Sequence, residues 1–339
     1  MAESDLEAAR QRIFQLCRGW WENKAFMVAS RLGLFTALAG GPRDAAAVAA
    51  EIGAEPDTTE LLLNAMVALG FLTKEGGRFA NTPEAALLLV RGSDAYFGDV
   101  PEYADLDWDI WARLEERVRG GQPVGIPFEA SDDEAEARRF IYQTIPRSTQ
   151  EAERLAKALD LSQSRRLLDV AGGSGVFSIA FCRANPQLQV VLFDRPPVVR
   201  VTAEIVAQEG LESRIHLRGG DFLSDDLGAG YDTVFLSAVI HLLGVAENRS
   251  LVAKIFRSLE SGGRLFLRDQ KMNADRTAPM YGVMHSLHLR LTRPGARMYS
   301  FEEAAGWMKT AGFRDVQELP ETAATAMRAG RATLLGVKP

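Results

Sequence analysis

Two acidic residues and a glycine-rich segment have the types and spacing of a nucleoside-binding site. The apolar segment 167–168 leads into Asp169 and then into the turn-like sequence Ala-Gly-Gly-Ser-Gly at 171–175. A second apolar segment, 190–193, ends in Asp194. We expect the first segment to form a strand, a tight turn and the start of a helix. Nucleosides bind beside such turns, at the open end of a doubly wound sheet. The glycines let the backbone approach a ligand closely, and the second acid accepts hydrogen bonds from both ribose hydroxyls.

The glycine spacing narrows the choice of nucleoside. A dinucleotide fingerprint needs a third small residue in G-x-G-x-x-G or A. Counted from Gly173 that position is Ser178, and counted from Ala171 it is Val176, so neither start completes the pattern. A P-loop is excluded because no Gly-Lys-Ser or Gly-Lys-Thr follows. The remaining pattern, D-x-A-x-G-x-G, resembles the first motif of S-adenosylmethionine-dependent methyltransferases, with Ala171 where a glycine is usual.

Further chemistry-bearing residues follow three other predicted strands. Asp221 and Phe222 are placed to accept from an adenine amino group and to stack on its ring; a capping aspartate and a core phenylalanine are the alternative. His241 comes just after the fourth strand and Asp269 at the tip of the fifth. Because neighbouring strand tips meet at one edge of a parallel sheet, we expect the two side chains to lie together. A neutral imidazole is a suitable general base, and an acid on its far nitrogen fixes its tautomer.

Alternating strands and amphipathic helices must position these residues. The chain from residue 165 onward predicts an α/β fold with a mostly parallel sheet. The expected strands are 166–170, 188–193, 214–217, 231–236 and 264–267, with candidate closing strands at 315–319 and 332–337 after a last helix at 301–311.

The N-terminal part has the pattern of a winged helix. Helical periodicity over 8–40, 45–52 and 58–69 precedes a short hairpin formed by 70–73 and 77–80. Such a unit often binds DNA, but residues 41–100 hold four basic residues against nine acidic ones. A DNA reader needs Lys and Arg for the phosphates, so a protein-contact role is favoured.

The composition is that of a soluble globular chain. Its 339 residues are 47% hydrophobic and 25% charged, and the net charge of −6 gives no attraction to nucleic acid or to anionic membranes. No apolar run approaches a membrane span, and the acidic start lacks an export signal, so a cytoplasmic location is expected. Cys17 and Cys182 are expected to be reduced core residues, and no zinc-type spacing is seen.

Nearly the whole chain resembles the class I O-methyltransferases of the plant caffeate and isoflavone type and their bacterial natural-product relatives. Beyond the residues above, the resemblance rests on 32–35, 68–72, 81–83, 219–222, 261–264 and 311–313. It implies a Rossmann-like methyltransferase domain and a mainly helical, winged-helix-like dimerisation domain. The implied division is a dimerisation domain at 1–100, a helical connector that contributes to the substrate pocket at 101–160, and a catalytic domain at 161–339.

The resemblance also implies roles for individual residues. His241 corresponds to the catalytic base, and Asp269 to an acid that orients it. Met298 stands where plant enzymes have a second acid, and Leu242-Leu243 replaces the family's Asp-Trp. The implied cofactor-binding residues are Ala171 and Gly173 by the methionine part, Asp194 and Arg195 by the ribose, Asp221 and Phe222 by the adenine, Ser237, where plant members often have a lysine, and Asp169 before the glycine turn.

A predicted helix around residues 280–290 supplies the substrate side. Met284 and His288, with Met298, are expected to line the acceptor pocket, since flexible thioethers suit aromatic contacts; ordinary core is the alternative. Weaker candidates are Met280, His285, Trp108, Trp111 and Tyr142.

The resemblance implies O-methylation of a hydroxyl on a small aromatic acceptor, as in secondary metabolism, by a homodimer that uses S-adenosylmethionine and no metal. Three alternatives remain. A C- or N-methyltransferase would use the same scaffold, with His241 only positioning the acceptor. A nicotinamide oxidoreductase is disfavoured by the incomplete dinucleotide spacing. A non-catalytic dimer would bind the cofactor without turning over an acceptor.

Overall fold

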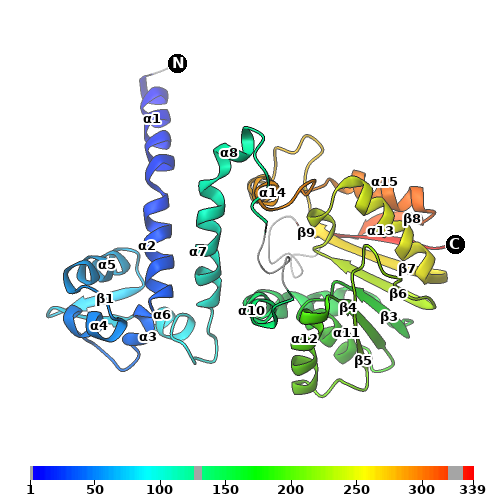
Figure 1. Cartoon of the computed structure of the whole chain (residues 1–339), viewed down its shortest axis with the longest axis horizontal. Helices are drawn as coiled ribbons and strands as arrows, with labels where there is room; N and C mark the ends of the chain where they lie inside the picture. Colours follow the sequence, from blue (N-terminus) through cyan, green and yellow to red (C-terminus); the bar gives the residue numbers. More distant parts are fainter. Residues whose placement is uncertain (1–2, 126–131, 320–330) are drawn as a thin grey trace. The chain divides into compact units, whose positions relative to one another are not determined.

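The computed structural model describes residues 3–125, 132–319 and 331–339. The chain divides into two compact units, Met1–Asp109 and Ile110–Pro339 (Figure 1). The roles expected for 1–100, 101–160 and 161–339 remain predictions.

The first unit is mainly helical, and its first helices precede a small hairpin, which confirms the expected order of elements. Gly76 and Gly77 both have positive φ (55° and 79°), as a two-residue hairpin turn requires. Asp44 and Thr82 begin two of the helices by accepting hydrogen bonds from backbone N–H groups of the first turn. The elements are α1 (Glu3–Arg18), α2 (Trp20–Arg31), α3 (Leu34–Ala37), α4 (Ala45–Ile52), α5 (Pro56–Ala68), β1 (Leu72–Glu75), β2 (Arg78–Asn81) and α6 (Pro83–Leu88), followed by α7 (Asp99–Ala112), which crosses the division.

Helix α1 buries none of its residues in the single chain. Ile13, Phe14 and Leu16 are all exposed. Cys17 lies on the same helix and is also exposed, so the expectation that it is a core residue is wrong for the single chain; Cys182 is buried. An amphipathic helix whose apolar side chains stay exposed in the described part of its own chain is typical of a surface that binds another protein.

A seven-stranded sheet forms the second unit, in the order β5-β4-β3-β6-β7-β9-β8. Strands β5, β4, β3, β6 and β7 pair in parallel, and β9 is antiparallel to its two neighbours. The strands are β3 (Arg166–Val170), β4 (Gln189–Asp194), β5 (Ile215–Gly219), β6 (Tyr231–Ser237), β7 (Leu259–Gln270), β8 (Arg314–Leu319) and β9 (Arg331–Val337). The mostly parallel α/β sheet predicted from the sequence is confirmed.

Helices cover both faces of this sheet (Figure 1). Successive residues of a strand point to opposite faces, so Leu167 packs in the core beneath α10, α11 and α12 while Leu168 packs in the core beneath α13 and α15. The helices of this unit are α8 (Leu114–Val118), α10 (Glu134–Ala158), α11 (Val176–Ala184), α12 (Pro196–Gln208), the 3₁₀ turn η1 (Ile240–Leu242), α13 (Val245–Ser258), α14 (Met280–Thr292) and α15 (Phe301–Ala311).

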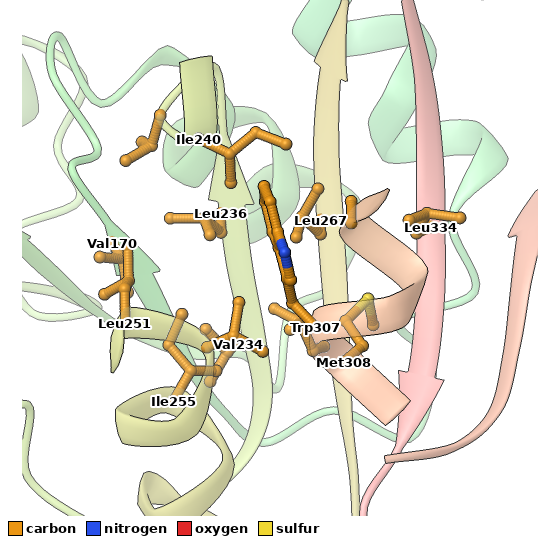
Figure 2. Close-up of a cluster of buried hydrophobic side chains, with 14 of the residues drawn as sticks. Val170, Val234, Leu236, Ile240, Leu251, Ile255, Leu267, Trp307, Met308 and Leu334 are labelled. Atoms are coloured by element: carbon orange, nitrogen blue, oxygen red, sulfur yellow. The ribbon is translucent and has the colours of Figure 1, made fainter. Parts of the chain in front are cut away.

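Figure 2 shows the core beneath α13 and α15. Trp307 of α15 lies between Leu236 of β6 and Leu267 of β7, and Ile240 closes one end of the cluster. Because Ile240 is the first residue of η1, this packing fixes the turn that follows β6. Among the described helices, none is long and apolar enough to cross a membrane.

Candidate active site

The strand order places a ligand site at the carboxyl end of β3. The chain runs outward from β3 through β4 to β5 and then returns to β6 on the other side of β3. Ligands of open α/β sheets bind at such a reversal, outside the carboxyl ends of the strands. The turn after β3 and the residues at the ends of β4, β6 and β7 therefore share one edge of the sheet.

The turn after β3 is shaped for close approach of a ligand. Ala171, Gly173 and Gly175 all have positive φ, at 58°, 55° and 76°. A Cβ atom on Gly172 would lie 2.5 Å from Cγ of Leu192, whereas one on Gly173 would meet nothing within 4 Å. The turn is thus packed against β4 on one side and open on the other. The left-handed conformation of Ala171 explains why a glycine is usual at that position.

The carboxylates of Asp194 and Asp169 both contact the glycine turn or the residues next to it. Asp194 accepts a 2.8 Å hydrogen bond from the Gly173 N–H and a 2.7 Å hydrogen bond from the Arg195 N–H. Burial raises the pKa of Asp194, although these hydrogen bonds oppose the shift. Each carboxylate oxygen keeps a second lone pair, so Asp194 retains the capacity to accept from hydroxyl groups of a ligand.

Asp169 lies deeper and is buried. It accepts a 2.6 Å hydrogen bond from Oγ of Ser178. Burial raises the pKa of Asp169 to about 7, against the lowering effect of the Ser178 hydrogen bond. Its carboxyl group also lies under Gly172, where an added Cβ would come within 2.9 Å of it. This position supports the turn from the side of the core.

Asp221 and Phe222 follow β5 in a turn. The last residues of β4 and β5, Asp194 and Gly219, are paired, so this turn adjoins Asp194. Asp221 is exposed and accepts from the Leu223 N–H at 2.8 Å, while Phe222 is half-buried against the core beneath α13 and α15. Both residues therefore have a structural role beside any role toward a ligand.

His241 and Asp269 lie together as expected. Nδ1 of His241 is 2.8 and 3.0 Å from the two carboxylate oxygens of Asp269, and both side chains are buried. Burial would raise the pKa of Asp269, but the charge and hydrogen bond of His241, with a smaller effect of Arg331, hold that pKa below its ordinary value. An ionised carboxylate only accepts hydrogen bonds, so Nδ1 carries a proton, and in the neutral ring the lone pair is on Nε2.

The turn η1 fixes the direction of the His241 ring. The Asn248 side-chain amide donates to the carbonyl of Ile240 at 2.9 Å, and the Arg297 N–H donates to the carbonyl of His241 at 3.1 Å. Ala238 enters the turn with φ of 58°. Short hydrogen-bonded turns of this kind hold a base in one orientation.

The predicted acceptor-binding residues occupy different environments. Met284 is 44% exposed, and His288 stacks on Trp111 with ring centroids 6.2 Å apart. Met298 is buried in a small apolar cluster with Met272 and Leu289, so it supports the site from beneath. Of the weaker candidates, Met280 and Tyr142 are exposed and Trp108 packs against Trp20 in the first unit.

Two further features lie near His241: His285, which was only a weaker candidate from the sequence, and a charge cluster that the sequence did not indicate. His285 of α14 has its ring centroid 5.3 Å from that of His241. The other feature is a buried charge cluster, in which Glu151 of α10 pairs with Arg268 of β7 and, at 3.0 Å, with Arg331 of β9. Arg268 also donates to Oγ of Ser237 at 3.3 Å, which joins the cluster to the end of β6.

The sheet order, the glycine turn, and Asp169 and Asp194 beside that turn are the features of a Rossmann-like methyltransferase. The family profile of an O-methyltransferase domain matches residues 111–314, and that of an O-methyltransferase dimerisation domain matches residues 14–91. The chain belongs to this O-methyltransferase family, whose methyl donor is S-adenosylmethionine. The family, fold and cofactor expected from the sequence are thus confirmed.

Individual relatives cover nearly the whole chain. It is 33% identical to a 3-hydroxy-5-methyl-1-naphthoate 3-O-methyltransferase of Streptomyces sahachiroi, over 90% of each chain. It is 31% identical to an N,N-dimethyltransferase of Streptomyces rimosus, over 91% of each. The crystal structure of human N-acetylserotonin methyltransferase in complex with S-adenosylmethionine superposes with a TM-score of 0.83 at 26% identity, covering 100% of this chain and 99% of that one.

Proposed function

We propose that the protein methylates a hydroxyl group of a small aromatic acceptor, with His241 as general base and Asp269 as the residue that positions it. The observation that carries the proposal is the buried His241–Asp269 pair at the strand ends beside the glycine turn. The naphthoate 3-O-methyltransferase relative supports an aromatic hydroxyl as the acceptor.

The residues at the ends of β3, β4, β5 and β6 suit S-adenosylmethionine. The open side of Gly173, together with Ala171, would hold the methionine part; Asp194 would accept from the ribose hydroxyls with Arg195 beside it. Asp221 and Phe222 would frame the adenine, Ser237 would line the site at the end of β6, and Asp169 would hold the turn in shape. When bound, S-adenosylmethionine supplies a methyl group that is already activated on a sulfonium sulfur.

The residues of the chain then have to prepare the acceptor. A phenol has a pKa of about 10 and is mostly neutral at pH 7. Nε2 of His241 removes its proton as the oxygen attacks, and Asp269 holds Nδ1–H and stabilises the imidazolium that results. Met284 and His288 line the acceptor side, with Met298 beneath it. Holding both reactants in line contributes several kcal/mol to the lowering of the barrier.

An acceptor nitrogen is the second candidate. The relative named as an N,N-dimethyltransferase favours it. With a nitrogen acceptor, the lone pair of the nitrogen attacks directly. His241 would then orient the acceptor, and it would not act as the base that prepares it. The two candidates differ in the effect of pH on the activity of a His241 variant.

Cofactor binding is tested by thermal shift with Asp194 variants. S-adenosylhomocysteine should raise the Tm of the wild type, since a ligand that binds only the native state stabilises it. Asp194→Asn should fold and lose most of this shift, because the amide has one oxygen left to accept from the ribose and must also hold the Gly173 N–H. Glu212→Gln, at an exposed acid without a role here, is the matched control and should keep the full shift. A shift with NAD and none with S-adenosylhomocysteine would contradict the assignment.

We infer that the first unit forms a homodimer. The dimerisation profile covers residues 14–91, and the exposed apolar residues of α1 include Phe14 and Leu16. Light scattering should give about twice the 37.1 kDa chain mass. Phe14→Glu combined with Leu16→Glu should shift the protein toward monomer, because charges on an apolar interface are not paired. A monodisperse wild-type monomer at micromolar concentration would sink the inference.

A further inference from the structure

A row of aromatic rings runs along one face of α14 and ends beside the base. Tyr281, His285 and His288 follow helical spacing and therefore share a face. The His285 ring centroid is 5.4 Å from that of Tyr281, 6.1 Å from that of His288 and 5.3 Å from that of His241. His285 is thus the residue of this helix whose ring adjoins the proposed base.

One ring nitrogen of His285 has no partner in the described part of the chain. Its Nδ1 is buried and makes no hydrogen bond to any described residue. Native proteins leave few buried polar atoms unpaired, because an unmade hydrogen bond costs the full desolvation of the atom. A buried, unpaired nitrogen beside a base is explained if a bound molecule supplies its partner.

The protonation state of His285 restricts that partner. Burial, followed by the neighbouring His241 and His288, lowers the pKa of His285 to about 3. The ring is therefore neutral at pH 7, with one nitrogen that donates and one that accepts. Such a ring fits a neutral hydroxyl or carbonyl oxygen and gives no charge attraction to a carboxylate.

We propose that His285 hydrogen-bonds a second oxygen of the acceptor, on a position ortho or peri to the hydroxyl that is methylated. This inference rests on the proposed O-methylation and adds the acceptor class: an aromatic diol or hydroxy-carbonyl compound with adjacent oxygens. Adjacent oxygens are inferred because the rings of His241 and His285 are themselves neighbours, with centroids 5.3 Å apart.

The proposed contact also has a chemical consequence. Adjacent oxygens share an internal hydrogen bond, which withholds the reacting proton from an external base. By binding the second oxygen, His285 competes with that internal bond and leaves the proton to Nε2 of His241. The proton passes to His241, and the methyl group passes to the acceptor oxygen as its bond to the sulfonium sulfur breaks and S-adenosylhomocysteine leaves. His285 ends in the state in which it began.

Isomeric acceptors separate this role from general pocket packing. The matched set is 2,3-dihydroxynaphthalene, whose oxygens are adjacent, and 2,7-dihydroxynaphthalene, whose oxygens are on different rings. We expect the wild type to prefer the 2,3 isomer by about 10-fold or more in kcat/KM, the scale of one hydrogen bond in a buried site. Calorimetry in the presence of S-adenosylhomocysteine should show the same order in Kd.

Variants of α14 then test the residue itself. His285→Phe keeps an aromatic ring without nitrogens. It should bring the ratio of the kcat/KM values for the 2,3 and 2,7 isomers, and the ratio of their Kd values, close to one. His285→Asn keeps a donor and an acceptor and should retain part of the preference. Arg290→Ala, at an exposed position of the same helix, is the control and should retain all of it. If His285→Phe does not fold, the His285→Asn and wild-type ratios still decide the matter.

The outcomes distinguish this inference from the proposed function. Equal use and equal binding of the two isomers by the wild type, or an unchanged preference in His285→Phe, would overturn the role of His285 while leaving O-methylation intact. Absence of methyl transfer to oxygen in every isomer would contradict the proposed function, and the ratio of Kd values would then decide the role of His285 on its own.

Discussion

His241→Gln is expected to lower kcat/KM for a phenolic acceptor by about 10²–10⁴ at pH 7, the usual contribution of a general base. The amide cannot take the proton that Nε2 removes, while the glycine turn and Asp194 are untouched. The thermal shift with S-adenosylhomocysteine should therefore stay close to that of the wild type. Steady-state methylation and thermal shift on the same preparation measure the two effects.

Asp269 variants, a control histidine and the effect of pH test whether His241 acts as the base. Asp269→Asn should lose less activity, and the double variant should lose less than the product of the single losses, because the acid acts through the histidine. His216→Gln, at an exposed histidine of β5, should be unaffected. Raising the pH toward the pKa of the phenol should restore part of the His241→Gln activity. Full activity of His241→Gln at pH 7 would contradict the base assignment, and a loss without rescue at high pH would favour an acceptor nitrogen or carbon.

Glu151→Gln should lower the free energy of unfolding by about 3–5 kcal/mol, the cost of breaking a buried ion pair and leaving a charge unpaired. Glu151 is paired with Arg268, which is 3% exposed, and with Arg331. The substitution keeps the size of the side chain but removes the charge that compensates both guanidinium groups. Urea denaturation followed by circular dichroism measures the change.

The same helix supplies the control for this experiment. Glu153→Gln makes the same change at an exposed position of α10 and should alter stability by no more than about 0.5 kcal/mol. A loss below about 1 kcal/mol for Glu151→Gln would mean that the cluster does not hold α10 against the sheet.

Much of the sheet could be predicted because its signals are local. Strand β3 and helix α15 have the bounds that the sequence indicated, and the structure shows that a capping box between Ser300 and Glu303 begins α15. Strand β7 starts at Leu259 rather than 264. Gly262 and Gly263 both hydrogen-bond to Lys338 near the C-terminus, a pairing that no local pattern reveals.

The site could be predicted only where topology brings strand ends together. His241 and Asp269 follow neighbouring parallel strands, so the order of elements was enough to place them side by side. Glu151 is 117 residues from Arg268 and 180 from Arg331, and such pairs depend on how α10 packs on the sheet. His285 had a usable signal, its helical spacing from Tyr281 and His288, but its contact with η1 is tertiary. The prediction for Cys17 failed for another reason. Helical periodicity identifies an apolar face, but it does not tell whether that face is buried within the chain or against a partner.

The most direct measurement is the fate of a labelled methyl group. The wild type should be incubated with trideuteromethyl S-adenosylmethionine and 2,3-dihydroxynaphthalene, and the product examined by mass spectrometry and NMR. The predicted result is one trideuteromethyl group on oxygen, formed by the wild type and strongly reduced in His241→Gln. Label on a ring carbon, or no transfer by a protein that binds S-adenosylhomocysteine and is offered a panel of phenols, would contradict O-methylation with His241 as the base.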